Sequence, residues 1–231
     1  GVASAPEWST IIVKRVVTDS RAIQAGDLFI ALVGDRFDGH DFVAQALRDG
    51  AVAAVVAHPV ADCTGPLLQV HDTLLALGQL GRSWREQFSC PVVAITGSNG
   101  KTSVKEMVAA ILRAACADDA AVLATHGNLN NEIGVPLTLL SLRPHHRFAV
   151  IEMGMNHLGE LANLTHLAQP DVALINNAHQ AHLGELGSLD NIARAKSEIF
   201  QGVRAGGVAI FPAESPYCAF WHTQAGDLKK R

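Results

Sequence analysis

Short apolar runs separated by turn-forming residues make up the first part of the chain. The pattern predicts strands at residues 11–17, 28–31 and 53–56, and helical spacing of apolar positions over residues 41–49. Glycine and aspartate residues fall between these segments, where turns need them. We therefore expect a small mixed α/β domain over residues 1–88.

After Pro91 the pattern changes to apolar strands that alternate with helical segments. Strands that are apolar throughout are typical of a parallel sheet that helices cover on both faces. The pattern therefore predicts a doubly wound, mostly parallel α/β domain over residues 89–231, whose ligands bind beyond the carboxyl ends of the strands. The expected strands are residues 92–96, 122–124, 148–153, 172–176 and 208–211, and the expected helices are 102–115, 158–167 and 191–200.

Three polar clusters directly follow predicted strands of this second domain. They occupy residues 96–102, 152–157 and 176–182. Because the carboxyl ends of parallel strands lie at one edge of a sheet, we expect the three clusters to converge there.

The first of these clusters has the context of a phosphate-binding loop, because it follows a strand and opens a helix. Small residues let backbone N–H groups turn toward phosphate oxygens, and the amino end of the helix adds its dipole. Lys101 supplies a cation, and the next residue, Thr102, is placed to hold Mg²⁺. The common pattern has its first glycine where this chain has Ile95, so a glycine turn that happens to precede a lysine is the alternative. The loop consists of Thr96, Gly97, Ser98, Asn99, Gly100, Lys101, Thr102 and Ser103.

Two further side chains are candidates for the metal and the phosphates. Glu152 ends an apolar strand, where a carboxylate has no packing purpose but offers the hard oxygen ligands that Mg²⁺ prefers. The alternative for Glu152 is a solvated acid at a strand end. His182 follows the strand at 172–176 among small and polar residues, and its pattern fits a phosphate or metal contact as well as a surface position.

The roles of the asparagines and of Lys196 stay open on local pattern alone. Asn128, Asn130 and Asn131 precede an apolar segment, where they fit helix capping as well as the recognition of a polar substrate. Lys196 lies on a predicted helix two residues before Glu198, so the simplest interpretation is a solvent-facing lysine beside an acid.

Composition narrows the class of protein. The 231 residues are 48% hydrophobic and 17% charged, as in globular α/β proteins. A net charge of −4 gives no electrostatic support for a nucleic-acid partner. The longest apolar run, residues 51–57, is far below the roughly 20 residues that cross a bilayer. The four cysteines are scattered, and no basic-then-apolar leader follows Gly1, so we expect a cytoplasmic monomer with free thiols.

Five ordered motifs together resemble the Mur ligase family, whose members form amide bonds with ATP. The motifs are residues 95–107 (ITGSNGKTSVKEM), 128–140 (NLNNEIGVPLTLL), 151–154 (IEMG), 176–188 and 195–200 (AKSEIF). Within the family, the resemblance is strongest to the members that add D-alanyl-D-alanine to UDP-N-acetylmuramoyl-tripeptide in peptidoglycan synthesis. It implies a phosphate-loop ATP-binding domain and ATP and Mg²⁺ as cofactors.

The resemblance also implies roles for single residues. Lys101 would bind phosphate, and Asn131 would lie near the transferring phosphate and the substrate. Lys196 would be carbamylated by CO₂, and its anionic form would help to hold a second Mg²⁺. The residues implied at the magnesium sites are Thr102, Glu152, His182 and Lys196, and those implied in catalysis are Lys101, Asn131, His182 and Lys196.

In the first domain, residues 18–21 (TDSR) and 34–40 (GDRFDGH) resemble the segments that hold the UDP-sugar end of the substrate. The residues implied there are Ser20, Arg21, Arg36 and Asp38.

Family members are about twice as long as this chain. The resemblance therefore implies that the sequence ends inside the central domain, without the later part of its sheet and the C-terminal domain, and we expect that these 231 residues do not complete the reaction alone. Three alternatives stay open. They are a sister ligase (one that adds the third peptide residue, or a folylpolyglutamate synthase), a phosphate-loop kinase or NTPase, and a nucleotide-binding module without catalysis.

Overall fold

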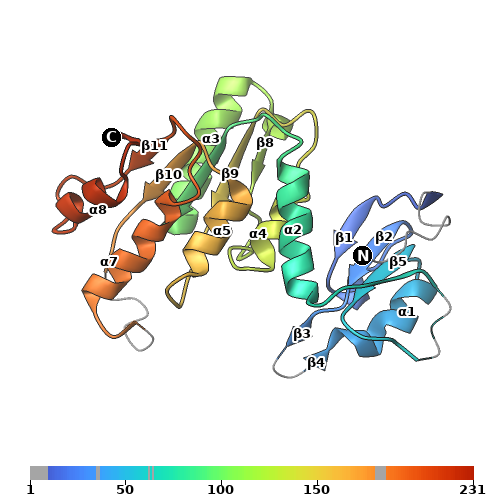
Figure 1. Cartoon of the computed structure of the whole chain (residues 1–231). Coiled ribbons are helices and arrows are strands. Elements are labelled where there is room, and N and C mark those ends of the chain that lie inside the picture. Colours follow the sequence, from blue (N-terminus) through green and yellow to red (C-terminus); the bar gives the residue numbers. More distant parts are fainter. Residues whose placement is uncertain (1–9, 35–36, 62, 64, 180–185) are drawn as a thin grey trace. The chain divides into compact units, whose positions relative to one another are not determined.

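The computed structural model describes residues 10–34, 37–61, 63, 65–179 and 186–231. The chain divides into two compact units, Gly1–Gln79 and Leu80–Arg231, and the division falls within helix α2 (Thr73–Arg85). Figure 1 shows the elements of both units along the chain. Arg36 and His182, two of the expected site residues, lie outside the described residues.

The first unit is built on a four-stranded parallel sheet in the order β1-β2-β5-β6. The first expected strand is shorter than its apolar run, because pairing with β2 begins only at Arg15, and Ile12 is 79% exposed. The expected helix at 41–49 is confirmed as α1, which a 3-10 turn precedes. The elements are β1 (Arg15–Val17), η2 (Ser20–Ala22), β2 (Asp27–Ile30), β3 (Val33–Gly34), β4 (Phe37–Asp38), η3 (Gly39–Phe42), α1 (Val43–Arg48), β5 (Ala53–Val56) and β6 (Leu67–Gln69).

The second unit holds a six-stranded parallel sheet in the order β12-β11-β10-β7-β9-β8. The five apolar segments expected as strands all form strands of this sheet. The two-residue edge strand β12 was not expected, because its two lysines carry no apolar signal. The strands are β7 (Val92–Thr96), β8 (Val122–Ala124), β9 (Phe148–Glu152), β10 (Val172–Ile175), β11 (Val208–Ile210) and β12 (Lys229–Lys230).

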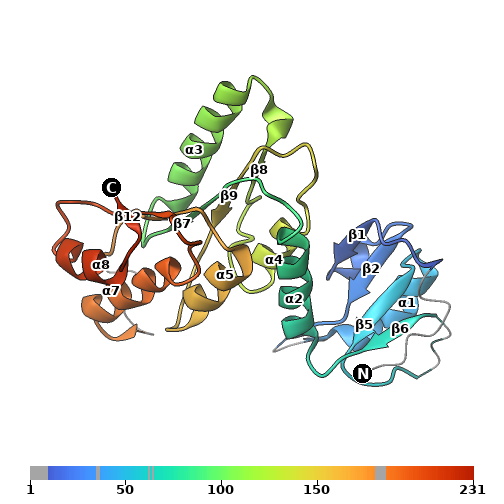
Figure 2. The ribbon, with the colours of Figure 1, turned by 45° about the horizontal axis from the view of Figure 1, so that its top comes forward.

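Helices cover both faces of this sheet, as the continuous apolar strands predict. Figure 2 shows α3 on one side, with α5 and α7 on the other. Alternate residues of β7 divide between two cores, because Ile95 packs in the cluster with α3, whereas Val92 and Ala94 pack in the cluster with α5 and α7. The helices are α3 (Lys101–Cys116), η4 (Asp119–Ala121), α4 (Gly134–Leu139), α5 (Glu160–Ala168), α7 (Leu189–Ser197), η5 (Glu198–Phe200) and α8 (Cys218–Gln224).

Every helix among the described residues is too short or too polar to span a bilayer.

The larger core should dominate the stability of the second unit. Leu139→Ala should lower its free energy of unfolding by about 2–5 kcal/mol, because Leu139 is fully buried in the cluster with α5 and α7. Ile111→Ala removes a side chain that is 68% exposed and should change that free energy by less than about 0.5 kcal/mol. Urea unfolding followed by circular dichroism measures both, and equal shifts would contradict this assignment of the core.

Candidate functional site

The carboxyl ends of three neighbouring strands bring the polar clusters of the second unit together. The register pairs Ile95 of β7 with Glu152 of β9, and Thr96 with Ile175 of β10. The loops that follow these strands therefore begin side by side at one edge of the sheet. This is the edge where ligands of doubly wound sheets bind.

The loop after β7 leaves the amino end of α3 open. Gly100 precedes α3 with a φ of 73°, a left-handed conformation that glycine adopts without strain, and no side chain caps the helix. A Cβ at Gly97 would lie 3.0 Å from Cβ of Asn176, so the loop packs closely on the segment after β10. The first N–H groups of a helix have no partner within it, and the helix dipole makes them a favourable site for an anion.

Lys101 folds back over this loop. Its Nζ donates to the carbonyl oxygens of Gly97 at 2.8 Å and of Ser98 at 3.4 Å. Burial lowers the pKa of Lys101, while the charge of Glu152 acts in the opposite direction. Lys101 is therefore held beside the open end of α3, close enough to interact electrostatically with Glu152.

Two asparagines after β10 hold the same loop from the other side. The Asn177 side-chain oxygen accepts from the backbone N–H groups of Ser98 and Asn99, both at 3.0 Å. The side-chain amides of Asn176 and Asn177 both donate to the Asn99 carbonyl, at 2.8 and 3.0 Å. Sequence reasoning placed this segment near the site but assigned no role to either asparagine. Their position directly after a strand was the signal for them.

Glu152 is 2% exposed and lies at the centre of the hydrogen bonds between these loops. Its Oε2 accepts from the Thr102 hydroxyl at 2.9 Å, and its Oε1 accepts from the Asn130 amide at 2.7 Å. The backbone N–H of Glu152 donates to the Thr125 hydroxyl at 2.9 Å. The two oxygen ligands expected for Mg²⁺, from Thr102 and Glu152, are thus in direct contact, and Glu152 is not a solvated acid.

Asn130 and Asn131, neighbours in the loop before α4, make different contacts. Asn130 binds Glu152, whereas the Asn131 side-chain oxygen accepts from the backbone N–H of Gly134 at 2.9 Å, at the start of α4. Both also line the cavity described next. The family resemblance implied Asn131 as one of four residues in catalysis, and the sequence had no signal that Asn130 contacts the carboxylate.

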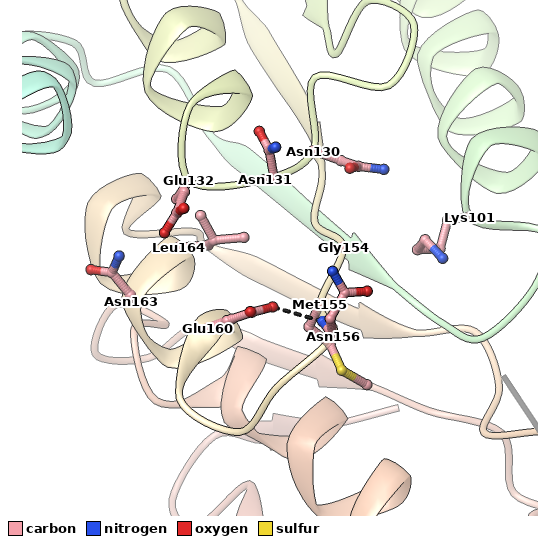
Figure 3. A pocket seen from close by; sticks show the side chains of 10 residues that line it. All are labelled: Lys101, Asn130, Asn131, Glu132, Gly154, Met155, Asn156, Glu160, Asn163 and Leu164. Atoms are coloured by element: carbon pink, nitrogen blue, oxygen red, sulfur yellow. Dashed lines mark hydrogen bonds between the residues drawn. The ribbon is translucent and has the colours of Figure 1, made fainter. Parts of the chain in front are cut away.

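A cavity of about 300 Å³ opens beside Lys101. Figure 3 shows Lys101 on one side of it, with Glu132 and Glu160 on the other. The cavity therefore has a cationic side and an acidic side, which suits a ligand that carries both kinds of charge. Its lining residues are Lys101, Asn130, Asn131, Glu132, Gly154, Met155, Asn156, Glu160, Asn163 and Leu164.

Lys196 does not face solvent, contrary to the simplest interpretation of its sequence. It lies on α7 and is 2% exposed, and no hydrogen bond or ion pair joins its Nζ to another described residue. Burial, and secondly the charge of Lys101, lower its pKa to about 7. A large fraction of its amine is therefore neutral, and hence nucleophilic, near neutral pH.

Thr96 carries a buried polar group without a partner among the described residues. Its hydroxyl is fully buried and is the buried side-chain polar atom that lacks a hydrogen-bond partner among the described residues. Side chains alternate along β7, so Thr96 shares the face of Val92 and Ala94, which pack with α5 and α7. Unpaired buried polar groups are costly and are typical of functional sites.

In the first unit, Ser20 and Arg21 line a cavity of about 460 Å³ together with Phe37. Arg21 is exposed, and its guanidinium donates to both oxygens of Asp19 at 2.9 and 2.7 Å. This pairing lowers the pKa of Asp19 to about 2. The arginine expected at the UDP-sugar site is therefore presented as half of an ion pair.

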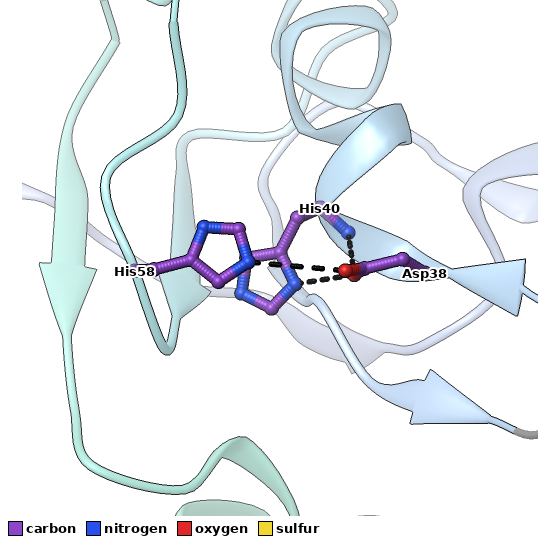
Figure 4. A group of neighbouring side chains, drawn as sticks. All are labelled: Asp38, His40 and His58. Atoms are coloured by element: carbon purple, nitrogen blue, oxygen red, sulfur yellow. Dashed lines mark hydrogen bonds and ion pairs between the residues drawn. The ribbon is translucent and has the colours of Figure 1, made fainter.

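Asp38, the other expected residue of that site, is bound to His40 (Figure 4). Its Oδ1 accepts from the His40 backbone N–H at 2.9 Å and from the ring Nδ1 at 2.5 Å. The backbone bond, followed by the ring bond, lowers the pKa of Asp38. His58 stacks on His40 with 3.9 Å between ring centroids, so Asp38, His40 and His58 form a cluster with metal-ligand composition.

The hydrogen bonds of His40 rule this cluster out as a metal site. The Ala57 backbone N–H donates to His40 Nε2 at 2.8 Å, so that nitrogen presents its lone pair there. A neutral imidazole has one lone pair and one N–H, so Nδ1 carries the proton that Asp38 accepts. Coordination of a metal through Nδ1 would require a lone pair on that nitrogen, which the protonated Nδ1 does not have. We therefore interpret the cluster as a structural brace.

Comparison with known proteins finds a family model for each of the two units. The family model "Mur ligase middle domain" matches residues 95–230, and "Mur ligase family, catalytic domain" matches residues 12–85. The UDP-N-acetylmuramoyl-tripeptide–D-alanyl-D-alanine ligases of Haemophilus influenzae and Escherichia coli are 48% and 49% identical, over 92% and 96% of this chain. The alignments cover 46% and 48% of those proteins, so the chain spans about half the length of these relatives.

Solved structures give the same result. The crystal structure of MurF from Acinetobacter baumannii has a TM-score of 0.89 at 47% identity, over 94% of this chain and 47% of that chain. MurF ligase from Thermotoga maritima, in complex with ADP, has a TM-score of 0.84 at 32% identity, over 96% of this chain and 50% of that one. The first family model alone matches more than half of the sequence. With both units matched by family models and by relatives of 48% and 49% identity, the chain belongs to the Mur ligase family.

Proposed function

We propose that this chain forms the nucleotide-binding and UDP-sugar-binding part of an ATP-dependent ligase that adds D-alanyl-D-alanine to UDP-N-acetylmuramoyl-tripeptide. The observation that carries the proposal is the contact between Thr102 and Glu152 beside the uncapped amino end of α3, with Lys101 above it. The relatives from Haemophilus influenzae and Escherichia coli are named as ligases with this activity. The proposal places the reaction in the cytoplasm and the protein in a monomeric state.

The loop fits the phosphate tail of ATP. The open N–H groups at the start of α3 would donate hydrogen bonds to phosphate oxygens, and the two glycines leave room for the backbone to approach those oxygens. Lys101 would turn from the Gly97 carbonyl to the outer phosphates, because an anionic oxygen is a stronger acceptor than a neutral carbonyl. The ADP named in the Thermotoga maritima complex supports this ligand.

The oxygen pair of Thr102 and Glu152 fits a magnesium ion, because Mg²⁺ usually takes one or two protein oxygens in addition to phosphate and water. A carbamylated Lys196 would add an anionic oxygen ligand, and His182, which lies outside the described residues, would complete the second site. Mg²⁺ would supply Lewis-acid neutralisation of the phosphate charge.

The reaction we propose has two displacements. The terminal carboxylate of the tripeptide attacks the γ-phosphorus of ATP, and ADP leaves, which gives an acyl phosphate. The amine of D-alanyl-D-alanine then attacks the acyl carbon, loses a proton, and expels inorganic phosphate. Lys101 and the α3 dipole would stabilise the negative charge on the transferring group, and Asn131 would hold the substrate at the cavity wall.

At the other end of the substrate, we propose that the cavity lined by Ser20 and Arg21 takes the UDP-sugar group. The exposed Arg21 guanidinium is tethered to Asp19, so it would meet a diphosphate with its orientation already set. Asp38 would contribute through its second oxygen, because the first one is bound by His40.

Lys101→Ala should weaken binding of Mg²⁺–ADP by at least about tenfold, because hydrogen bonds to charged groups contribute about 1.5–3 kcal/mol and about 1.4 kcal/mol corresponds to a factor of ten. Isothermal titration calorimetry measures the change. Lys14→Ala, which removes an exposed lysine of the first unit, is the control and should bind as the wild type does. Unchanged affinity in a folded Lys101→Ala protein would remove the basis of the proposed function.

Lys196 should form a carbamate in bicarbonate buffer. Only the neutral amine attacks CO₂, and the pKa of Lys196 is about 7 against an ordinary value of 10.5. The carbamate should therefore appear as the pH rises through about 7. Carbon-13 NMR with labelled bicarbonate should show one resonance that Lys196→Met lacks. A spectrum identical for both proteins would show that this lysine is not carbamylated.

Without CO₂, the buried amine should make stability depend on pH. Between about pH 7 and 10 the unfolded chain keeps a proton on Lys196 that the folded chain has lost, because the folded pKa is lowered from 10.5 to about 7. The free energy of unfolding should therefore rise with pH in this window, and stay at its lower level below it. Lys196→Met lacks this dependence. Urea midpoints of both proteins at several pH values test it, and parallel curves would contradict it.

A further inference from the structure

The loop between β7 and α3 is braced by a side chain from the segment after β10, the strand that pairs with β7. Asn177 accepts from two successive N–H groups of the loop, those of Ser98 and Asn99, through a single oxygen. Its amide nitrogen donates to the Asn99 carbonyl, so one side chain makes three hydrogen bonds to two loop residues. Two donors that meet one oxygen are the usual arrangement around an anion in such loops. Here an uncharged amide of the protein provides that oxygen.

These hydrogen bonds divide the N–H groups of the loop into two sets. The donors of Ser98 and Asn99 are satisfied within the protein. The donors at the start of α3 have no side-chain cap, because Gly100 at the cap position offers none. The brace therefore fixes the first half of the loop and leaves the helix end open to a ligand.

We propose that Asn177 is a positioning residue that holds the phosphate loop in its nucleotide-binding shape before nucleotide arrives. The inference rests on the proposed function, because it takes phosphate as the ligand of the open donors. Without the Asn177 side chain, the N–H of Asn99 would lose its acceptor, and the N–H of Ser98 would keep only the Asn177 backbone carbonyl at 3.2 Å. The ligand would then have to order this part of the loop. A site that is ordered only on binding spends part of its interaction energy on that ordering and binds more weakly.

The amide group suits this position for two reasons. It accepts from N–H groups and donates to a carbonyl at once, whereas an ionised carboxylate only accepts. It also adds no charge, so it does not repel the phosphates that the adjacent donors would bind. The Asn99 carbonyl has a second donor in Asn176, so its own hydrogen bonding does not depend on Asn177 alone.

Other contacts keep the loop attached to this segment when Asn177 is changed. The Ser98 hydroxyl donates to the His179 carbonyl at 3.0 Å and accepts from the His179 N–H at 2.9 Å. A variant at Asn177 should therefore fold, and the loss of hydrogen bonds should be confined to the first half of the loop.

The test compares Asn177→Ala with the wild type in two measurements. Amide hydrogen exchange of the nucleotide-free protein should be at least about tenfold faster at Asn99 in the variant, because Asn99 loses its acceptor, and unchanged in β7. The increase should be smaller at Ser98, whose N–H keeps the Asn177 backbone carbonyl as an acceptor. The affinity for Mg²⁺–ADP by calorimetry should fall by about tenfold, the factor expected from the loss of one or two ordered hydrogen bonds. Gln87→Ala, which removes an exposed side-chain amide, is the control and should change neither.

Asn177→Asp separates bracing from charge. Its carboxylate keeps an acceptor for the two N–H groups, so exchange at Ser98 and Asn99 should be slower than in Asn177→Ala, while the affinity for Mg²⁺–ADP stays low because an anion now lies beside the phosphates. A residue with only a general structural role would move stability, exchange and affinity together in both variants.

The outcomes distinguish this inference from the proposed function. If the wild type binds Mg²⁺–ADP and Asn177→Ala binds it equally well, the positioning role is wrong. If the wild type does not bind Mg²⁺–ADP, the proposed function fails, and equal exchange in wild type and Asn177→Ala would then overturn the brace as well.

Discussion

The unpaired N–H groups at the amino end of α3 are the constraint around which the second unit is arranged. A helix of 16 residues that begins with an uncapped turn presents partial positive charge with no internal partner. Gly100 makes that end possible, because its left-handed backbone turns the chain from the loop into the helix without a side chain that could cap it. The surrounding residues then secure the loop without filling the helix end. Lys101 bends back onto carbonyls, and Asn177 takes only the earlier donors.

Charge in the site is arranged with few ionised groups. Lys101 and Lys196 are both partly or fully buried, and Glu152 is the carboxylate whose charge acts on Lys101. Burial of the Lys196 amine, and secondly the charge of Lys101, lower its pKa to about 7. Conversion of that amine to a carbamate would replace a costly cation by an anion that attracts Lys101 and a metal ion. Burial thus disfavours the protonated amine of Lys196 and, for the same reason, leaves the neutral amine that reacts with CO₂.

Much of the second unit was predictable, because the residues that determine its strands and its loop are close together in the sequence. Strands such as 148–152 are apolar throughout, and the loop from Thr96 to Ser103 carries its residues in one stretch. The contact between Thr102 and Glu152 followed from strand ends that meet at one edge of a parallel sheet. The family itself was recognised from five such local motifs, and the family models confirm it.

What could not be predicted depends on contacts between distant segments. Asn130 and Asn131 are neighbours with identical side chains, and only the folded loop shows that the first binds Glu152 and the second the start of α4. Lys196 lies beside polar residues in the sequence, so its burial is visible only once α7 packs against the sheet. Asn177 needs the register of β10 with β7 to reach the loop. Arg36 and His182 lie outside the described residues, so their predicted roles stay predictions.

The prevalence of asparagine around the phosphate loop has a common physical reason. A site that binds a polyanion and a metal ion must hold its loops in place without adding charge that competes with either. Carboxamides accept and donate hydrogen bonds while remaining neutral at every pH, so they fix geometry and leave the local potential to lysine and glutamate. Asn130 orients Glu152, and Asn176 and Asn177 brace the loop, each without charge. The asparagines thereby add hydrogen bonds to a geometry that Glu152 and Lys101 also help to set, without adding charge of their own.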